Sequence, residues 1–203
     1  MQGLGMDLAD GRHLLTGADM TVEPGQRLML SGRSGSGKST LLRAMGHLWP
    51  AGHGNIRLPA ARYLFLPQKP YLPIGTLREA LSYPQAGDTY PNERYVHVLE
   101  TCRLPHLVAR LDEANHWQRL LSPGEQQRLA FARALIYAPQ WLYMDEATSA
   151  MDEEDEASLY QALIDELPGL SIISVGHRSS LKRFHPRHIR IENGRLVDQA
   201  VTA

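Results

Sequence analysis

One loop pattern, Gly32–Thr40, limits the possible folds of this 203-residue chain more than any other feature. It reads Gly32-Arg33-Ser34-Gly35-Ser36-Gly37-Lys38-Ser39-Thr40 and fits G-x-x-x-x-G-K-[ST], the pattern of a phosphate-binding loop. The glycines let the backbone curl so that successive N–H groups converge on an anion. Lys38 can reach the β- and γ-phosphates of a nucleotide, and the Ser39 hydroxyl can bind Mg²⁺. A short apolar strand pattern before the loop and a helical pattern after it predict the strand–loop–helix setting that phosphate binding needs.

The bulk composition excludes several classes of protein. With 43% hydrophobic residues, the chain can form one domain around its own core, and its net charge of −1 gives no reason to expect a nucleic-acid partner. The single cysteine, Cys102, excludes an internal disulfide and is typical of a reducing compartment. No apolar run reaches the roughly 18 residues of a membrane-spanning helix. Any membrane-spanning part is therefore expected in a partner chain or in a segment absent from this sequence, and the abrupt start at Met1 favours the second.

Strand and helix patterns alternate along the chain, separated by turn signals such as Asp10-Gly11 and the break at Trp49-Pro50-Ala51-Gly52-His53-Gly54. The expected strands lie within 3–31 and at 55–58, 62–66, 141–146, 171–175 and 189–197, and the expected helices lie at 39–45, within 76–111, and at 122–137 and 153–167. This alternation predicts an α/β fold, with a P-loop NTPase core, a mainly parallel sheet, an antiparallel β subdomain at the N-terminus and a helical subdomain. We expect a single domain over residues 1–203. Residues 1–75 and 138–203 form its core with the β subdomain, and residues 76–137 form its helical subdomain.

Two acids, Asp145 and Glu146, end an apolar strand. The first acid at such a place can hold Mg²⁺ through water, and the next can polarise an attacking water molecule. A strand-end pair of acids also occurs as an ordinary helix cap or turn. Its combination with a phosphate loop favours the catalytic interpretation.

Three further positions are ambiguous on their own. Ser122, Pro123 and Glu125 form a capping box at a helix start, which is either an ordinary cap or an anion site. Gln68, between two prolines, can bind Mg²⁺ or orient water. His177, just past a buried strand, can donate a hydrogen bond to a γ-phosphate, although each of these residues taken alone is more often structural.

Taken together and in this order, these residues resemble the ATP-binding cassette (ABC) ATPases, from about residue 4 to residue 198. Gly32–Thr40 resembles Walker A, Gln68 the Q-loop glutamine, Leu121–Gln126 the signature, Leu142–Glu146 Walker B, Ser149-Ala150-Met151-Asp152 the D-loop and His177 the switch histidine. The resemblance implies ATP and Mg²⁺ as cofactors, and a head-to-tail dimer, expected to be a homodimer, when ATP is bound. In that dimer each ATP lies between the Walker motifs of one subunit and the signature of the other.

The resemblance also implies a role for each matched residue. Residues implied to bind the phosphates are Gly32, Arg33, Ser34, Gly35, Ser36, Gly37, Lys38, Ser39 and Thr40; those implied to organise Mg²⁺ are Ser39, Gln68 and Asp145; and those implied to close over the partner's ATP are Ser122, Pro123, Gly124 and Glu125. Glu146 is then the general base for water, assisted by His177, Gln68 and Lys38.

Within that family, Leu66–Arg78, Trp117 and Ser174–Arg178 resemble an exporter-type subgroup. The subgroup includes peroxisomal fatty-acyl half-transporters and bacterial relatives linked to cobalamin, bleomycin and peptide uptake. Its members carry a transmembrane domain before this domain on the same chain. The resemblance therefore implies ATP-driven transport at the cytoplasmic face of a membrane, here a bacterial inner membrane.

The sequence departs from the family at two places. Most members of the family stack the adenine on an aromatic residue, and the corresponding position here falls near Leu8. No aromatic residue occurs before Trp49. We therefore expect the site to select less strictly among nucleotide bases. Pro123 and Glu125 replace the usual glycine and glutamine of the signature, although the helix cap is kept and function is expected to survive.

Two alternatives remain open. The first is a soluble ABC ATPase without transport, which the lack of a coiled-coil insertion, a second cassette or a basic patch disfavours. The second is a nucleotide-dependent switch that hydrolyses poorly, which the presence of Glu146 disfavours.

Overall fold

The computed structural model describes residues 1–8, 11, 13–49 and 52–199. The turn signals at Asp10 and Pro50-Ala51 lie outside these residues. The chain divides into two compact units, a sheet unit (residues 1–65, 140–146 and 169–203) and a helical unit (residues 66–139 and 147–168). The helical unit includes residues 76–137, where the sequence predicts the helical subdomain.

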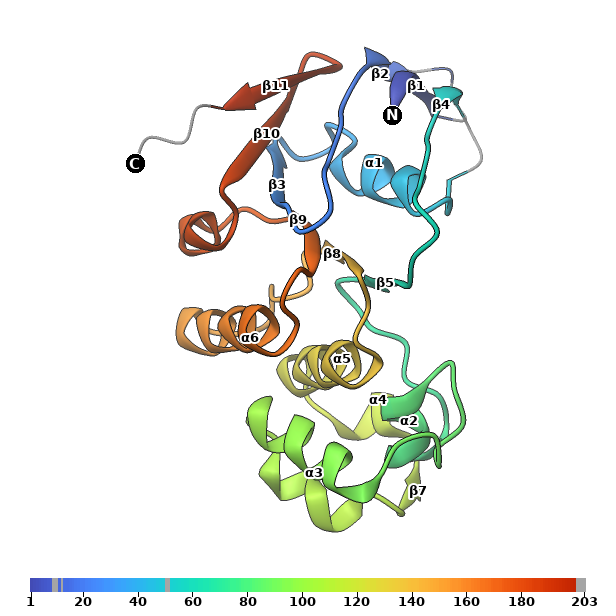
Figure 1. Cartoon of the computed structure of the whole chain (residues 1–203), viewed down its shortest axis with the longest axis vertical. Coiled ribbons are helices and arrows are strands. Elements are labelled where there is room, and N and C mark those ends of the chain that lie inside the picture. The colour runs from blue at the N-terminus through green and yellow to red at the C-terminus, as the bar shows by residue number, and fades with distance from the viewer. Residues whose placement is uncertain (9–10, 12, 50–51, 200–203) are drawn as a thin grey trace. The chain divides into compact units, whose positions relative to one another are not determined.

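The sheet unit is built around a six-stranded sheet with the order β11-β10-β3-β9-β8-β5 (Figure 1). Its elements are β1 (Gln2–Asp7), β2 (His13–Ala18), β3 (Arg27–Gly32), α1 (Lys38–Met45), β4 (His53–Asn55), β5 (Tyr63–Leu66), β8 (Trp141–Asp145), β9 (Ser171–Val175), the 3₁₀ helix η2 (Ser179–Phe184), β10 (Arg187–Glu192) and β11 (Arg195–Gln199). Strands β8, β9, β3 and β10 pair in parallel, and β11 pairs antiparallel with β10. Every residue of β8 and β9 is buried, as expected for central strands of a parallel sheet. The predicted α/β class with a mainly parallel sheet is confirmed.

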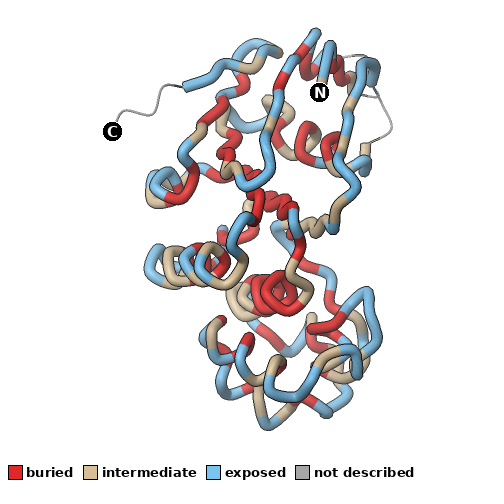
Figure 2. Tube along the Cα trace, in the orientation of Figure 1, coloured by how far each residue is buried: buried red, intermediate tan, exposed pale blue. Residues whose placement is uncertain are grey.

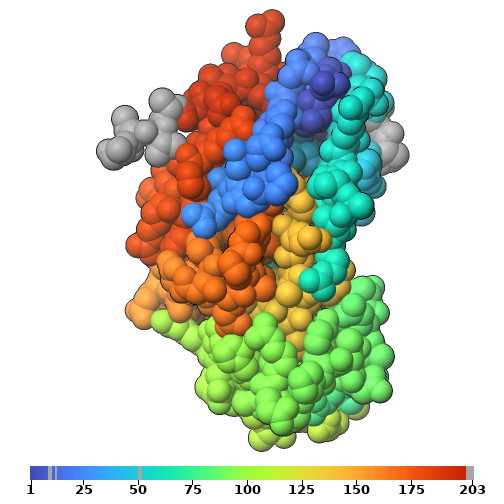
Figure 3. Space-filling model, in the orientation of Figure 1, coloured from blue at the N-terminus to red at the C-terminus, as the bar shows by residue number. Residues whose placement is uncertain are grey.

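The N-terminal strands form the predicted antiparallel sheet, with the order β2-β1-β4. Apolar side chains of β1 and β2, such as Leu4 and Leu15, join those of β3 and α1 in one buried core. The C-terminal hairpin lies beside β2, where the N–H of Thr16 donates to the carbonyl of Gly194 at 3.0 Å. Figure 3 shows this hairpin, in red, next to the blue N-terminal segment. The hairpin therefore reaches the same end of the sheet unit as the phosphate loop that follows β3.

The helical unit is organised around helix α5. Its elements are β6 (Gly75–Thr76), α2 (Leu77–Ser82), α3 (Asn92–Thr101), the 3₁₀ helix η1 (Pro105–Arg110), β7 (Ala114–Asn115), α4 (Trp117–Leu120), α5 (Pro123–Tyr137) and α6 (Glu153–Glu166). Helix α5 contributes Leu129, Phe131 and Leu135 to the interior, and Figure 2 shows it as the most continuously buried coil of this unit. Helix α5 begins with the predicted capping box at Ser122, and helix α2 begins with a capping box at Thr76.

Two local predictions are wrong. The expected strand 55–58 is instead β4, at His53–Asn55. A Cβ atom on Gly54 would lie only 2.5 Å from the carbonyl oxygen of Gly3, so glycine lets β4 approach β1 here, although glycine usually signals a break. The helical spacing at 104–111 forms a 3₁₀ turn, since the segment is short and Pro105 opens it.

Candidate functional site

The phosphate loop connects β3 to α1 with a tightly curled backbone. Gly32, Gly35 and Gly37 all have positive φ angles, and a Cβ atom on Gly32 would lie 2.9 Å from the carbonyl oxygen of Ile191. The ammonium of Lys38 folds back into the loop and donates to the carbonyls of Gly32 at 3.1 Å and Arg33 at 3.0 Å. Gly37, the N-cap of α1, offers no side-chain cap, so within the described residues the first N–H groups of α1 remain available for an anion.

Asp145 lies at the carboxyl end of β8 and is only 5% exposed. One carboxylate oxygen accepts the Ser39 hydroxyl at 2.6 Å, and the other lies 3.5 Å from a guanidinium nitrogen of Arg43. A hydroxyl and a carboxylate held together are oxygen ligands of the kind that Mg²⁺ prefers. The donor set therefore fits a magnesium ion bound beside the loop.

Glu146 and His177 follow neighbouring parallel strands and meet at the same edge of the sheet. His177 Nε2 lies 3.2 Å from Glu146 Oε1. The backbone of Glu146 has a positive φ of 52°, and its N–H donates to the carbonyl of Val175 at 3.1 Å. The end of β9 therefore sets the position of the residue that follows β8.

Lys38, Ser39, Glu146 and His177 line one cavity of about 300 Å³, and Asp145 is not among its lining residues. Its lining residues are Leu8, Leu14, Ser34, Gly35, Gly37, Lys38, Ser39, Thr40, Glu146 and His177. Burial lowers the pKa of Lys38, and the nearby charges of Glu146 and Asp145 partly oppose this shift. The cavity thus has a cationic and hydroxyl-bearing part, a carboxylate–imidazole pair and two aliphatic side chains, Leu8 and Leu14, a combination that fits a magnesium nucleotide.

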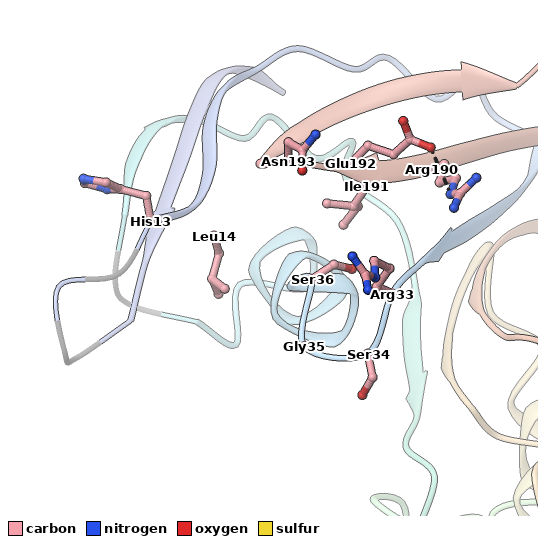
Figure 4. A pocket seen from close by; sticks show the side chains of 11 residues that line it. His13, Leu14, Arg33, Ser34, Gly35, Ser36, Arg190, Ile191, Glu192 and Asn193 are labelled. Atoms are coloured by element: carbon pink, nitrogen blue, oxygen red, sulfur yellow. Dashed lines mark ion pairs between the residues drawn. The ribbon is translucent and has the colours of Figure 1, made fainter.

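The loop also borders a second cavity, of about 590 Å³ (Figure 4). Its lining residues include His13, Leu14, Arg33, Ser34, Gly35, Ser36 and residues 190–194 of the hairpin. Arg190 and Glu192 form an ion pair at 3.0 Å in its wall. The Ser36 hydroxyl is buried without a hydrogen-bond partner among the described residues. Arg33 and Ser36 were expected to bind the phosphates. Their side chains instead border this second cavity and not the cavity that contains Lys38 and Glu146.

The predicted signature residues lie at the start of α5 in the helical unit. The Ser122 hydroxyl donates to the Glu125 carboxylate at 2.7 Å. The oxygen of the same hydroxyl accepts the backbone N–H of Glu125 at 3.3 Å. His106 Nε2 lies 3.0 Å from the other carboxylate oxygen of Glu125. Burial raises the pKa of the Glu125 carboxyl. The hydrogen bonds from Ser122 and His106 outweigh this effect and hold the pKa below its ordinary value. Pro123 occupies the first helical position, as predicted.

Gln68 and the segment Ser149–Asp152 also belong to the helical unit. The Gln68 amide donates to the Ser149 hydroxyl at 3.4 Å, and the Asp152 carboxylate caps α6 by accepting the N–H of Asp155 at 2.7 Å. Met151 is buried, whereas Ser149 and Ala150 are exposed. Within each unit the structure brings the expected residues together; Gln68 and the signature lie in a different unit from the phosphate loop.

Two further side chains lie beside these residues and were not predicted from the sequence, Arg43 and Gln127. Arg43 faces Asp145, one helical turn after Ser39. Gln127 is a buried polar residue of α5, located four residues before Phe131. A polar residue on the apolar face of the predicted helix was the sequence feature that could have indicated a buried, hydrogen-bonded side chain.

Comparisons with known proteins agree with this geometry. The sequence model of the ABC transporter family matches residues 15–149. An uncharacterised ABC transporter ATP-binding protein of Haemophilus influenzae is 44% identical over 183 residues, which cover 90% of this chain and 31% of that protein. The mouse lysosomal cobalamin transporter ABCD4 is 42% identical over 196 residues, with 89% and 32% covered, and the ABC transporter D family member 2 of Dictyostelium discoideum is 35% identical over 195 residues, with 92% and 26% covered.

The chain therefore spans about a third of the length of the curated relatives that it matches. Among the residues that the structure describes, no helix combines the length and the apolar character that crossing a bilayer requires.

Proposed function

The chain belongs to the ABC transporter family, and we propose that it is the ATP-hydrolysing domain of an exporter-type member. It binds ATP with Mg²⁺ and hydrolyses the terminal phosphate, and this reaction drives a substrate through a transmembrane domain outside this chain. The observation that carries the proposal is the single cavity that contains Lys38, Glu146 and His177. A carboxylate beside the phosphate site favours hydrolysis over a switch that only binds nucleotide.

Each group in the cavity has a role that follows from its chemistry. Lys38 and the N–H groups at the start of α1 hold the phosphates. Mg²⁺, when bound, neutralises the charge that develops on the transferred phosphoryl group. Ser39 and Asp145 would hold this ion, and Gln68 is a further proposed ligand. The Glu146 carboxylate accepts a proton from the attacking water, and the neighbouring His177 donates a hydrogen bond to the γ-phosphate.

A second copy of the domain completes each site. The start of α5 is exposed at Ser122, and the neighbouring segment Ser149–Asp152 is exposed at its first two residues. In the ATP-bound homodimer, Ser122 and Gly124 of one copy cover the ATP of the other. The proposal therefore makes hydrolysis depend on dimerisation.

Exposed apolar side chains on the helical unit support a membrane-domain partner. Tyr71 and Ile74 are 57% and 73% exposed, and Tyr83 and Leu120 are exposed as well. The rings of Tyr71 and Tyr83 contact edge to face, with centroids 5.4 Å apart. Large exposed apolar side chains commonly mark an interaction site. We propose that these side chains contact the transmembrane domain, and that the ATPase lies at the cytoplasmic face of a membrane, in a bacterium the inner membrane.

Two experiments test the proposal. The purified chain should hydrolyse ATP in the presence of Mg²⁺, and Lys38→Ala should abolish binding of labelled ATP. The full-length protein, reconstituted in vesicles, should move substrate only with ATP, and cobalamin is the first substrate to test because ABCD4 is named as a cobalamin transporter. ATP hydrolysis by a full-length protein that has no transmembrane domain would instead support a soluble, non-transporting ATPase.

A further inference from the structure

Helix α5 carries a buried side-chain amide that the proposed mechanism does not use. Gln127 is only 3% exposed, and its amide makes three hydrogen bonds. The amide nitrogen donates to the carbonyl of Gln68 at 2.9 Å and to the hydroxyl of Ser149 at 3.2 Å. The amide oxygen accepts the N–H of Ala150 at 2.9 Å. Both donor hydrogens and the acceptor of this side chain are therefore used.

The three partners belong to two exposed segments that are 59 and 22–23 residues away from Gln127 in sequence. Gln68 provides the amide that we propose as a ligand for Mg²⁺. Ser149 and Ala150 open the segment that we propose to face the second copy. Gln127 joins both segments, and it lies on the helix whose first residues contact the partner's ATP.

A second contact fixes the same segment against α5. A Cβ atom on Gly124 would lie 3.1 Å from the carbonyl oxygen of Ala150. Ala150 is thus held on both sides, through its N–H by Gln127 and through its carbonyl beside Gly124. A displacement of Gln68 would be transmitted through the Gln127 amide to Ala150 and to the start of α5, because all three partners bind one rigid planar group.

We infer that Gln127 is a positioning residue that couples Gln68 to the segment Ser149–Ala150 and to the signature at Ser122. The inference rests on the proposed function, since it concerns the same site and the same dimer. Gln127 itself touches neither nucleotide nor water in this account. It sets the placement of Gln68, the proposed ligand for Mg²⁺, relative to the groups that are proposed to contact the partner.

Two substitutions distinguish the hydrogen bond of Gln127 to Gln68 from its hydrogen bond to Ala150. In Gln127→Leu all three hydrogen bonds are lost, which leaves the N–H of Ala150 and the carbonyl of Gln68 without this partner. In Gln127→Glu the carboxylate still accepts from Ala150 and can accept from the Ser149 hydroxyl, but it has no donor for the carbonyl of Gln68. Gln161→Glu on α6 is the matched control, because it makes the same chemical change at an exposed amide.

The test measures ATPase kinetics, ATP affinity of the monomer and amide hydrogen exchange. We expect kcat to fall about tenfold in Gln127→Leu and Gln127→Glu, with ATP affinity of the monomer changed less than about twofold. In a Glu146→Gln background, Gln127→Leu should also reduce the ATP-dependent dimer. The N–H of Ala150 should exchange faster in Gln127→Leu but not in Gln127→Glu. Gln161→Glu should change none of these quantities.

Two results would overturn the inference. One is an unchanged kcat in a folded Gln127→Leu protein. The other is a fall in kcat accompanied by an equal fall in monomer ATP affinity and by a lower melting temperature, which describes a purely structural residue. Failure of the proposed function gives a different result, namely no hydrolysis by the unaltered protein; the exchange of Ala150 needs no turnover and still tests the link to Gln127.

Discussion

The hydroxyl of Ser39 donates to a carboxylate oxygen of Asp145 at 2.6 Å, across 106 residues of sequence. Ser39 lies in the first turn of α1, and Asp145 ends β8, so the contact joins the phosphate loop to the edge of the sheet. Two oxygen atoms suited to Mg²⁺ are therefore already adjacent within the protein itself. Such preorganisation reduces the reordering that ion binding would otherwise require.

Ser39→Ala should mainly weaken the use of Mg²⁺. The alanine lacks one oxygen ligand and leaves Asp145 without its hydroxyl donor, so the Mg²⁺ concentration for half-maximal ATPase activity should rise about tenfold or more. ATP affinity measured in a metal chelator should stay the same. A magnesium titration of ATPase activity checks this, and an unchanged midpoint would contradict the assigned role of Ser39.

Leu8→Tyr should tighten ATP binding. Leu8 lines the cavity next to Leu14, where no aromatic ring is present among the lining residues, and stacking of a base on an aromatic ring contributes on the order of 1 kcal/mol. We expect about a fivefold gain in ATP affinity, and weaker binding in the control Leu8→Ala. Equal affinities of the unaltered protein and the Leu8→Tyr variant in competition binding would show that the base does not lie against this residue.

Mixing two inactive proteins should restore hydrolysis if the site is shared. Lys38→Ala removes the phosphate contact, and Ser122→Arg blocks the surface that covers the partner's ATP. Half of the dimers in an equal mixture contain one intact site, so activity should recover to about a quarter of the unaltered rate. No recovery, in a mixture that a cross-linking assay shows to form mixed dimers, would contradict the head-to-tail arrangement.

His185 should make stability depend on pH. Its Nδ1 faces the carbonyl of Leu181 at 2.8 Å and therefore carries the proton, while Nε2 accepts the Ser174 hydroxyl at 2.9 Å. Burial lowers the pKa of His185 to about 4, from an ordinary value near 6.5.

The unfolded chain thus binds a proton that the folded chain excludes, so this contribution to stability is complete above pH 6.5 and declines as the pH falls from 6.5 to about 4. Relative to His185→Gln, the free energy of unfolding should fall by up to about 1.4 kcal/mol per pH unit in that window. Parallel stability curves for the two proteins, obtained by urea unfolding, would contradict this assignment.

The sequence allowed prediction of those parts of the site that local chemistry dictates. The loop pattern, the acids after one apolar strand and His177 after another could each be recognised in the sequence, and the carboxyl ends of parallel strands meet at one edge of the sheet. The structure places Lys38, Glu146 and His177 around one cavity. The roles of these residues remain proposals that the experiments above test.

Other features depend on contacts that no local pattern encodes. Gln127 looks like any polar residue of a helix until the packing places Gln68 and Ala150 around its amide. Arg43 faces Asp145 only because α1 lies beside β8. Glycine at position 54 suggested a break, whereas the close approach of two backbones makes it part of a strand.

Replacement of the Glu146 carboxylate tests whether this chain hydrolyses ATP with Glu146 as the base. Glu146→Gln keeps the size of the side chain but cannot accept a proton from water. Steady-state ATPase activity should fall at least about a hundredfold, while ATP affinity is retained and an ATP-dependent dimer accumulates. Unchanged steady-state ATPase activity in Glu146→Gln would contradict the account.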